Sequence, residues 1–379
     1  MLPDKKPLKL AFIGGGEDSA VGYVHFSASQ LDNCFEVVAG AFSRSSKSNE
    51  LTAQRWNINS ERLYTCWKTL IQQEADNVDA FVLLTPTPDH LAMLTTLLDK
   101  NLAIICEKSL VGGPKEIALL KQHYQADKHF LAVTFNYSGY AMVRELKHKI
   151  ANGELGAIQK IHLEMPQEGF RRPPDIAGQA ATPQPWRLCD GELPTICLDL
   201  GVHLHHLSSF LLNIEPNETI AEFSNHSQYP ELIDDIQMLL KYPNNIKGSM
   251  WMSKTAIGHR NGLKIRVYGD QGSALWYQLN PDELELSFND GRREILDRAS
   301  QCHHAGKFIY NRMKPGHPTG FVEAFANLYR DIATSLHTFK SNKKIQSPYV
   351  FSVEHAADGL NLFKAAKEST LSSQWQKVK

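Results

Sequence analysis

The first 135 residues alternate short apolar runs with helix-like stretches, and this alternation limits the possible folds more than any other feature. The runs are rich in Val, Ile and Phe, as strands buried on both faces of a sheet are. They cover residues 8–13, 35–42, 80–84, 102–106 and 130–135. Helical stretches lie between them, for example over 91–100 and 115–125. This repetition predicts an α/β domain of Rossmann type, with a doubly wound parallel sheet and right-handed crossovers.

From about residue 158 the runs alternate polar with apolar residues, which is typical of an antiparallel sheet with one face in water. These runs cover 158–165, 220–225, 235–242, 246–253, 263–268 and 272–278. Helices are expected over 200–212, 320–336 and 352–368, and the proline-rich stretch 166–185 is expected to be a long loop. We predict a Rossmann domain over 1–136 and an α+β domain over 137–379 with a large, mainly antiparallel open sheet. The C-terminal helices can pack back on the first domain.

Composition removes several classes of function. The 40 Lys and Arg residues nearly balance the 41 Asp and Glu residues, whereas a nucleic-acid binder or a polybasic membrane anchor carries a basic excess. No apolar run reaches the ~18 residues of a membrane-spanning helix, and we expect no signal peptide. The six cysteines are scattered without a CxxC pair. We therefore expect a cytoplasmic protein with reduced thiols, and neither nucleic acid nor membrane as a partner.

A glycine turn, Gly14-Gly15-Gly16, directly follows the first apolar run. Glycines at this point let the backbone approach a pyrophosphate, and the next helix offers its N–H groups to the anion. The match to G-x-G-x-x-G is incomplete because Ser19 stands where the third glycine would be. The acidic pair Glu17-Asp18 should point away from a phosphate. A tight turn without a ligand is the alternative, but the alternation of strands and helices favours a dinucleotide site.

The end of the second run bears on the choice of nucleotide. An NAD site usually carries Asp or Glu there for the ribose 2′-hydroxyl, whereas this chain has Ser43, Arg44 and Lys47 and no acid. These side chains suit a 2′-phosphate, so NADP(H) is favoured over NAD(H). The same residues also fit a solvated loop that begins the next helix with Ser46 as its N-cap, and the two interpretations are compatible.

Two segments carry candidate catalytic groups. Lys108 follows the fourth run and should enter the crevice at the carboxyl ends of the strands, although a surface lysine is the alternative. Asp199 and His203 lie one turn apart on a predicted amphipathic helix, and His206 shares their face. A carboxylate at this spacing can orient an imidazole that acts as a general base. Asp199 could instead cap the helix.

No metal site is expected. The histidine-rich helix has no H-E-x-x-H spacing and no cysteine pair. The run Cys302-His303-His304 is interpreted as a solvated loop.

Together these motifs resemble the glucose-fructose oxidoreductase, inositol dehydrogenase and MocA family (Gfo/Idh/MocA). The similar segments run through nearly the whole chain in the family's order. They are the glycine turn with His25, the segments 85–90, 106–108, 136–140, 153–156, 185–187 and 199–203, and Gly316-His317-Pro318 before the helix that begins near Phe321.

The resemblance implies NAD(P)-dependent oxidation of a secondary hydroxyl of a sugar, inositol or sugar derivative, or the reverse reduction. It implies that His203 takes the hydroxyl proton, Asp199 supports His203, and Lys108 orients the substrate while C4 of the nicotinamide accepts hydride. Cofactor contacts are expected from the glycine turn, from the end of the second run, and from Thr85, Pro86, His90 and Glu107. Candidate substrate contacts are Asn136, Tyr137, Trp186, Arg187, His206 and His317.

The chain departs from the family pattern at Ser109, which replaces the usual proline after Glu-Lys. Because only an imide makes a cis peptide cheap, we expect the backbone that presents Lys108 to differ. The acidic pair in the glycine turn is a second departure.

Three further expectations complete the sequence-based hypothesis. The antiparallel sheet of the second domain, whose face commonly pairs subunits in this family, predicts a homodimer or homotetramer. Two other functions stay open beside the dehydrogenase. One is a non-catalytic dinucleotide-binding sensor, and the other is a redox-neutral lyase or glycosidase with tightly bound NAD.

Overall fold

The computed structural model describes residues 6–172, 183–345 and 347–379. The chain divides into two compact units. The first unit comprises residues up to Val111, Lys115–Gly139 and Gly320–Ala356, and the second comprises Gly112–Pro114, Tyr140–Thr319 and Ala357–Lys379. The domain boundary predicted after residue 136 lies near the point where the chain passes from the first unit to the second, between Gly139 and Tyr140. The C-terminal segment Gly320–Ala356 belongs to the first unit, which fits the expectation that C-terminal helices can pack back on the first domain.

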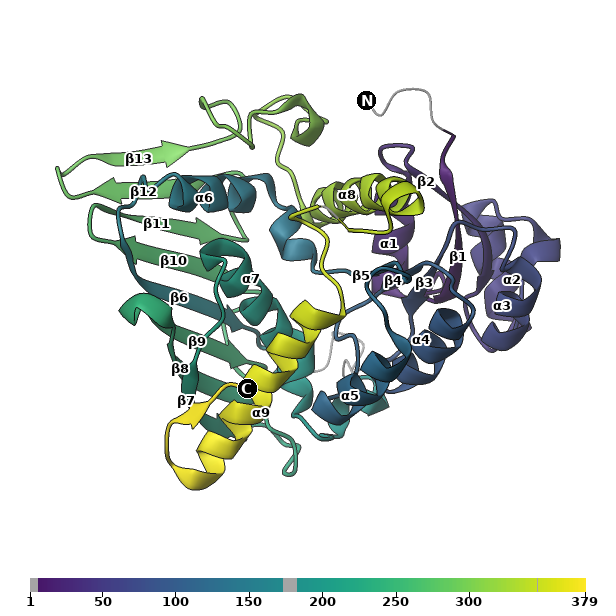
Figure 1. Ribbon diagram of the computed structural model, residues 1–379, viewed down its shortest axis with the longest axis horizontal. Helices are drawn as coiled ribbons and strands as arrows, with labels where there is room; N and C mark the ends of the chain where they lie inside the picture. Colours follow the sequence, from purple (N-terminus) through teal and green to yellow (C-terminus); the bar gives the residue numbers. More distant parts are fainter. Residues whose placement is uncertain (1–5, 173–182, 346) are drawn as a thin grey trace. The chain divides into compact units, whose positions relative to one another are not determined.

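The described part of the first unit contains a five-stranded sheet in the order β2-β1-β3-β4-β5 (Figure 1). All neighbouring strands are parallel. The strands are β1 (Leu8–Gly14), β2 (Phe35–Ala41), β3 (Ala80–Leu84), β4 (Ile104–Cys106) and β5 (Leu131–Val133). The predicted parallel Rossmann-type sheet is therefore confirmed. The strands lie where the sequence analysis expects them because their side chains are buried on both faces.

Helices cover the parallel sheet. They are α1 (Ala20–Gln30), α2 (Ser46–Trp56), α3 (Trp67–Glu74), α4 (His90–Asp99), α5 (Pro114–His123) and α8 (Phe321–Asn342), with short 3-10 turns η1 (Ser60–Arg62), η2 (Thr87–Asp89) and η3 (Asn136–Gly139). Helix α8 packs along α1, and aromatic side chains of both join the core of this unit. The ring of Phe325 lies edge-on to His25, with centroids 4.8 Å apart.

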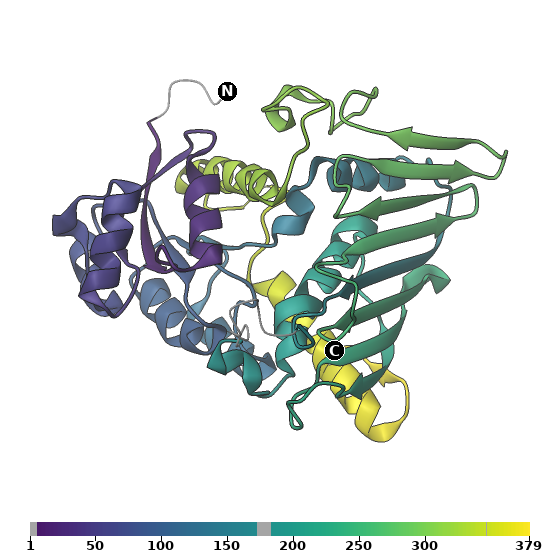
Figure 2. The same ribbon diagram turned by 180° about the vertical axis from the view of Figure 1, so that it is seen from behind.

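Within the described residues, the second unit contains a nine-stranded sheet in the order β13-β12-β11-β10-β6-β9-β8-β7-β14 (Figures 1 and 2). The strands are β6 (Ile158–Pro166), β7 (Glu218–Ser224), β8 (Asp235–Lys241), β9 (Lys247–Ser253), β10 (Lys264–Gly269), β11 (Gly272–Tyr277), β12 (Leu284–Phe288), β13 (Arg293–Leu296) and β14 (Gln376–Lys377). Neighbouring strands are antiparallel except β6 and β9, which are parallel. The mainly antiparallel open sheet is thus as predicted, whereas β12, β13 and β14 were not predicted.

Helices α6 (Ala141–Ala151), α7 (Val202–Leu212) and α9 (Val353–Ser372) lie on one face of this sheet (Figures 1 and 2). Short turns η4 (Pro185–Leu188), η5 (Cys197–Gly201), η6 (Pro243–Asn245) and η7 (Phe308–Tyr310) connect the elements. Along β8, buried residues such as Ile236 and Met238 alternate with exposed residues such as Gln237 and Leu239. Residues 173–182, in the middle of the predicted proline-rich loop, lie outside the described residues.

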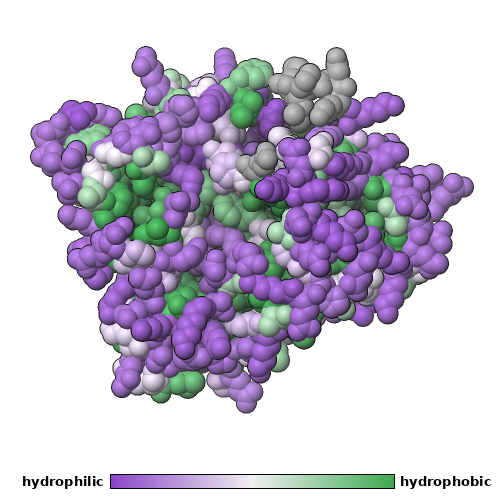
Figure 3. All heavy atoms as spheres, in the orientation of Figure 1, coloured by the Kyte–Doolittle hydropathy of each residue, from purple (hydrophilic) through white to green (hydrophobic). Residues whose placement is uncertain are grey.

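Figure 3 shows a face covered mostly by hydrophilic side chains, with smaller hydrophobic areas between them. None of the described helices is both long enough and apolar enough to cross a membrane.

Candidate active site

The glycine turn lies where the order of the parallel sheet reverses, between β1 and β3. Ligands of open α/β sheets bind at this switch point, beyond the carboxyl ends of the strands. Gly14 and Gly15 have φ angles of +81° and +72°, which favour glycine. A Cβ on Gly15 would lie 2.5 Å from Cδ1 of Leu84. The turn is therefore a bare backbone cradle directly beside the loop that follows β3.

Gly22 explains why the glycine fingerprint looks incomplete. A Cβ at this position would lie 1.9 Å from the carbonyl oxygen of Gly15, so only glycine lets α1 approach the turn this closely. Ser19 caps α1, and its hydroxyl accepts a hydrogen bond from the Gly22 N–H at 3.1 Å. Gly22 thus supplies the close packing that the third glycine of the fingerprint provides. The cradle and the N-terminus of α1 fit the pyrophosphate of a dinucleotide.

The acidic residue Glu17 does not weaken this fit. Its carboxylate lies 3.8 Å from the guanidinium of Arg55 on α2, and its N–H donates to the hydroxyl of Thr52. The neighbouring Asp18 is exposed.

The side chain of Asn49 holds the main chain of the loop after β2, and the two cationic side chains of this loop stay in solvent. The N–H of Ser43 donates to Oδ1 of Asn49 at 2.8 Å, and Nδ2 of Asn49 donates to the Ser43 carbonyl at 3.0 Å. Arg44 and Lys47 are exposed. The N-cap of α2 is Ser45, whose hydroxyl accepts from the N–H of Ser48, so the expectation for Ser46 is wrong by one residue. Ser45 has the extended backbone of a cap, and Ser46 is already helical.

His90 is fully buried and connects the loop after β3 to the loop after β4. Its Nε2 lies 2.8 Å from the carbonyl oxygen of Thr85, and its Nδ1 lies 3.1 Å from those of Ser109 and Leu110. Burial lowers the pKa of His90, and the neighbouring carbonyl groups offset this effect only in part. The ring of His90 therefore holds the loop of Thr85 and Pro86 in place, and a direct contact between His90 and the cofactor stays a prediction.

Glu107 sits in a buried network at the carboxyl end of β4. Its Oε1 lies 3.1 Å from Nε2 of His25 and accepts a hydrogen bond from the hydroxyl of Thr134, while Nδ1 of His25 lies 2.7 Å from the hydroxyl of Tyr329. Burial would raise the pKa of Glu107, but hydrogen bonds from His25 and Thr134 and the charge of Lys108 hold it below its ordinary value. An ionised Glu107 therefore anchors the main chain next to the candidate catalytic lysine.

Lys108 is half-buried and follows Glu107 at this edge of the sheet. The peptide bond between Lys108 and Ser109 is cis although residue 109 is not proline. The expected change of backbone, from a cis to a trans bond at this position, is therefore not observed.

In the second unit, Asp199 and His203 lie on a helix with an irregular turn. Residues Cys197–Gly201 form the π-helical turn η5, which runs directly into α7. Such insertions occur often at functional sites. A Cβ on Gly201 would lie 2.6 Å from Cζ of Phe363 on α9, so glycine lets this turn pack closely. Asp199 lies inside the π-turn, so the alternative of a helix cap is not supported.

The carboxylate of Asp199 is held by two cations. Its Oδ1 lies 2.6 Å from Nη1 of Arg187, and its Oδ2 lies 2.5 Å from Nζ of Lys254. The guanidinium of Arg187 also lies over the ring of Trp186, 4.4 Å from its centroid. Asp199, Arg187 and Lys254 line one small cavity together with Phe170, Thr195, Ile196, Leu232 and Ile233. The structure thus joins Asp199 to one of the predicted substrate-binding residues, Arg187, which in turn contacts a second, Trp186.

Lys254 is a site residue that the sequence analysis missed. It follows β9, and Gln167 follows β6, the parallel neighbour of β9. Because parallel strands end at the same edge of a sheet, the two side chains meet, and Nζ of Lys254 donates to Oε1 of Gln167 at 2.8 Å. A lysine directly after a predicted strand was the available signal, as it was for Lys108.

The other predicted substrate-binding residues differ in their surroundings. Asn136 and Tyr137 lie in η3 and are buried, and among the described residues Nδ2 of Asn136 has no hydrogen-bond partner. A buried amide donor of this kind suits a ligand. His206 is fully buried and stacks on Phe210, so its ring offers no surface to a substrate. His317 is exposed, and its carbonyl accepts a hydrogen bond from Arg298.

Two family models match this chain. Residues 8–135 match the model of an oxidoreductase family with an NAD-binding Rossmann fold, and residues 143–275 match the Gfo/Idh/MocA C-terminal domain. Together they cover candidate residues of both units, including the glycine turn, Lys108, Asp199 and His203.

Relatives and solved structures agree with these models. An uncharacterized oxidoreductase, YfiI, of Bacillus subtilis is 27% identical over 87% of this chain and 86% of its own. A D-xylose 1-dehydrogenase [NADP(+)] of Haloarcula marismortui is 28% identical over 58% of this chain and 61% of its own. The structure of an inositol dehydrogenase homolog of Azotobacter vinelandii, complexed with NADH and myo-inositol, is 26% identical. It superposes with a TM-score of 0.87 over 98% of both chains. The chain is a member of the Gfo/Idh/MocA family of NAD-binding oxidoreductases.

Proposed function

We propose that this oxidoreductase transfers hydride between a nicotinamide cofactor and a secondary hydroxyl or ketone of inositol, a sugar or a sugar derivative. The observation that carries the proposal is the carboxylate of Asp199, clamped between Arg187 and Lys254 on the helix of His203. These groups offer a hydroxyl-rich ring both hydrogen-bond donors and an acceptor. The named relatives act on, or are solved with, substrates of this class.

Each catalytic candidate has a distinct task in this reaction. His203 accepts the proton of the reacting hydroxyl, and the anionic carboxylate of Asp199 favours the imidazolium that results. Lys108 hydrogen-bonds the same hydroxyl and stabilises negative charge on its oxygen. When bound, the nicotinamide supplies the hydride acceptor at its C4. In the reverse direction, His203 returns the proton to the carbonyl oxygen.

We further propose that the enzyme uses NADP(H). The loop after β2 presents the exposed cations Arg44 and Lys47, and no carboxylate stands at the end of the strand to bind a ribose 2′-hydroxyl. The relatives include an NADP(+) enzyme as well as a structure with NADH, so the cations of this chain carry the proposal. The glycine cradle supports binding of either nucleotide.

The first test is a fluorescence titration of the purified protein with NADPH and then NADH. Tighter binding of NADPH is expected, and failure to bind either nucleotide would contradict the proposed activity. Inositols, sugars and sugar derivatives are then screened by nicotinamide absorbance in both directions. Turnover without any net change in absorbance would instead favour the redox-neutral lyase or glycosidase.

Replacing His203 separates an enzyme from a sensor. His203→Asn should lower turnover by about 10²–10⁴-fold while nucleotide binding persists, because a general base contributes that much to the rate. His226→Asn serves as the control, because His226 is an exposed histidine of the same unit with no role in the proposed site. A chain that binds nucleotide and polyol but never turns over, in wild type and variants alike, would be a sensor.

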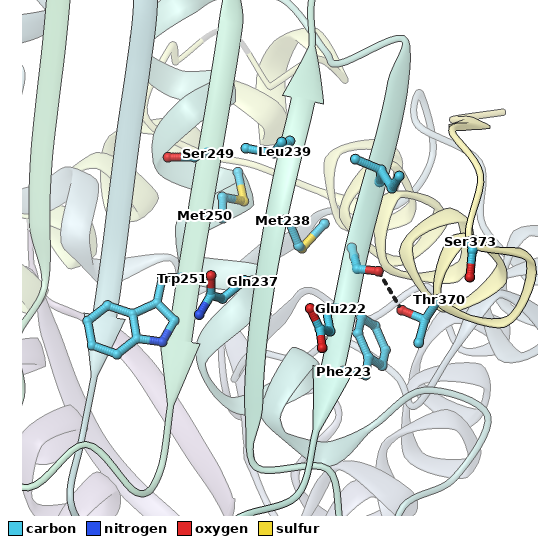
Figure 4. A pocket seen from close by; sticks show the side chains of 12 residues that line it. Glu222, Phe223, Gln237, Met238, Leu239, Ser249, Met250, Trp251, Thr370 and Ser373 are labelled. Atoms are coloured by element: carbon cyan, nitrogen blue, oxygen red, sulfur yellow. Dashed lines mark hydrogen bonds between the residues drawn. The ribbon is translucent and has the colours of Figure 1, made fainter.

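The exposed face of the nine-stranded sheet supports a homo-oligomer. Leu239 of β8 is 54% exposed there and Tyr268 of β10 is 38% exposed. Nearby, strands β7, β8 and β9 and the end of α9 line a hollow, where Thr370 donates to the Ala221 carbonyl (Figure 4). We propose that a second copy of the chain covers this face, to be tested by light scattering at micromolar concentration. A monomer would contradict it.

We place the enzyme in the cytoplasm. All six cysteines lie in the described residues and are free thiols, as expected in a reducing compartment. Fractionation of the source cells tests this assignment.

A further inference from the structure

Three histidines that the proposed reaction does not use lie together in the second unit. His148 is in the last turn of α6, and His303 and His304 are consecutive residues of the loop after β13. Each offers one ligand nitrogen, and the three atoms lie within 4.8 Å of one another. The rings of His148 and His303 stack with centroids 3.9 Å apart, and His304 lies edge-on to both.

The loop of His303 and His304 is fixed to α6 by a buried carboxylate. Glu145, one turn before His148 on the same helix, is 1% exposed. Its side chain accepts hydrogen bonds from the N–H groups of His303 at 3.1 Å, His304 at 2.6 Å and Ala305 at 3.2 Å. The interpretation of this run as a solvated loop is therefore wrong for its backbone. One helix supplies both the anchor of the loop and the third imidazole.

We propose that His148, His303 and His304 form a binding site for a transition metal ion of the zinc class. Imidazole nitrogens suit Zn²⁺, Ni²⁺ and Cu²⁺, and three histidines with a water molecule complete a tetrahedral zinc site. At Zn–N distances of about 2.0–2.1 Å, tetrahedral ligand atoms lie about 3.4 Å apart. The present separation of up to 4.8 Å requires an inward shift of roughly 1 Å, which rotation of the rings supplies.

The neighbouring side chains allow that rotation. His303 is exposed, so its ring can turn out of the stack and aim a nitrogen at the metal. The side-chain amide of Asn152 lies 2.8 Å from Nε2 of His148. An amide can present either its NH₂ group or its oxygen, so Asn152 can hold the His148 ring in either tautomer. Lys307 is exposed, and its ammonium, 3.5 Å from Nδ1 of His304, can move into solvent.

A metal at this site links the loop after β13 to the end of α6. None of its ligands belongs to the proposed dehydrogenase machinery, so the site acts on the stability of the second unit and not on the chemistry. The metal site and the proposed function can therefore fail independently of each other.

The test uses the full chain without a histidine tag, stripped with EDTA and dialysed. Zn²⁺ is titrated calorimetrically, and Co²⁺ replaces it for absorption spectroscopy. The wild type should bind one ion per chain and melt at a higher temperature with Zn²⁺. Co²⁺ should give visible tetrahedral bands without the near-ultraviolet band of a thiolate ligand. Binding by His303→Ala and by His304→Ala should be weakened at least about tenfold, since even second-shell changes cost that much.

His226→Ala is the matched control, because His226 is exposed in the same unit and only its main chain is hydrogen-bonded in the described contacts. This variant should bind like the wild type. Equal binding by wild type and the His303→Ala/His304→Ala double variant would overturn the site. So would a thiolate band with Co²⁺, or no uptake of Zn²⁺ at micromolar concentration. Because the side chain of His303 is exposed, we expect His303→Ala to retain the fold, so a loss of metal binding in this variant reports on the site itself.

Discussion

Replacing Gly201 with alanine should destabilise the second unit, although alanine is ordinarily the better residue in a helix. The new Cβ would lie 2.6 Å from Cζ and 2.9 Å from Cε1 of Phe363, and 3.1 Å from Sδ of Met252. Carbon atoms normally approach to about 3.5–4.0 Å, so the ring must retreat by roughly 1 Å. Phe363 is fully buried, so its ring has no open space to enter.

The expected magnitude follows from two opposing effects. Overpacking of a filled core costs about 1–3 kcal/mol. Alanine in place of a helical glycine returns about 0.5–1 kcal/mol. From the midpoints of these two ranges, the net loss in the free energy of unfolding is about 1 kcal/mol, or roughly 2–4 °C in the melting temperature of a unit of this size. Because Gly201 stands between Asp199 and His203, a displaced turn should also lower kcat, by up to about 100-fold.

Urea unfolding followed by circular dichroism measures the first effect, and steady-state kinetics measures the second. Gly191→Ala is the control, because nothing lies within 4 Å of a Cβ there. In a Phe363→Leu background, the cost of Gly201→Ala should fall by about 0.5 kcal/mol or more, since the two residues are in contact. If Gly201→Ala is as stable as the wild type, or if the two substitutions are additive, the argument from close packing is wrong.

Three further predictions test the rest of the site. A depressed pKa means that ionised Glu107 stabilises the fold above the ordinary value of 4.5 and that this stabilisation is lost as the pH falls below it. The difference in melting temperature between wild type and Glu107→Gln should accordingly be largest at neutral pH and shrink below pH 4.5; a constant difference would contradict the network. Lys254→Met should lower kcat by up to about 100-fold with less change in KM, because Asp199 loses one of its two cations, and an unchanged kcat would remove Lys254 from the site. The double variant Arg44→Ala/Lys47→Ala should bind NADPH at least about tenfold more weakly than the wild type does, because charge-assisted hydrogen bonds to the 2′-phosphate are lost. Its affinity for NADH should stay close to that of the wild type. An equal loss of affinity for both nucleotides would refute the role of these cations in 2′-phosphate binding.

The sequence predicts well those parts of the fold that local patterns determine. The five strands of the parallel sheet are continuous apolar runs, and burial on both faces makes such runs easy to recognise. Strands β12 and β13 were missed because they lie next to and at the edge of the sheet, where residues such as Glu285 and Ile295 face solvent and leave no continuous apolar run. Strand β14 has two residues, too few for any periodicity.

The site shows the same division between local and distant signals. Asp199 and His203 are four residues apart, so helical periodicity alone relates them. Lys254 and Gln167 meet only because β6 and β9 are parallel, and strand pairing over such a separation has no signature in the sequence. Likewise, nothing in the sequence relates His148 to a loop about 155 residues later; the contact depends on how α6 packs in the finished fold.

The first unit is assembled from chain on both sides of the second, and this order has a consequence for synthesis. Helix α8 supplies Phe325 and Tyr329 to the core around His25, yet it leaves the ribosome only after the whole nine-stranded sheet except β14. The nucleotide-binding unit is therefore incomplete during most of translation, and the apolar surface of α1 stays uncovered until α8 has been synthesised. A gene fragment that ends after Gly139 would encode all five strands of the parallel sheet but not helix α8, which completes their core, so it should be recovered folded only when residues 320–356 are supplied with it.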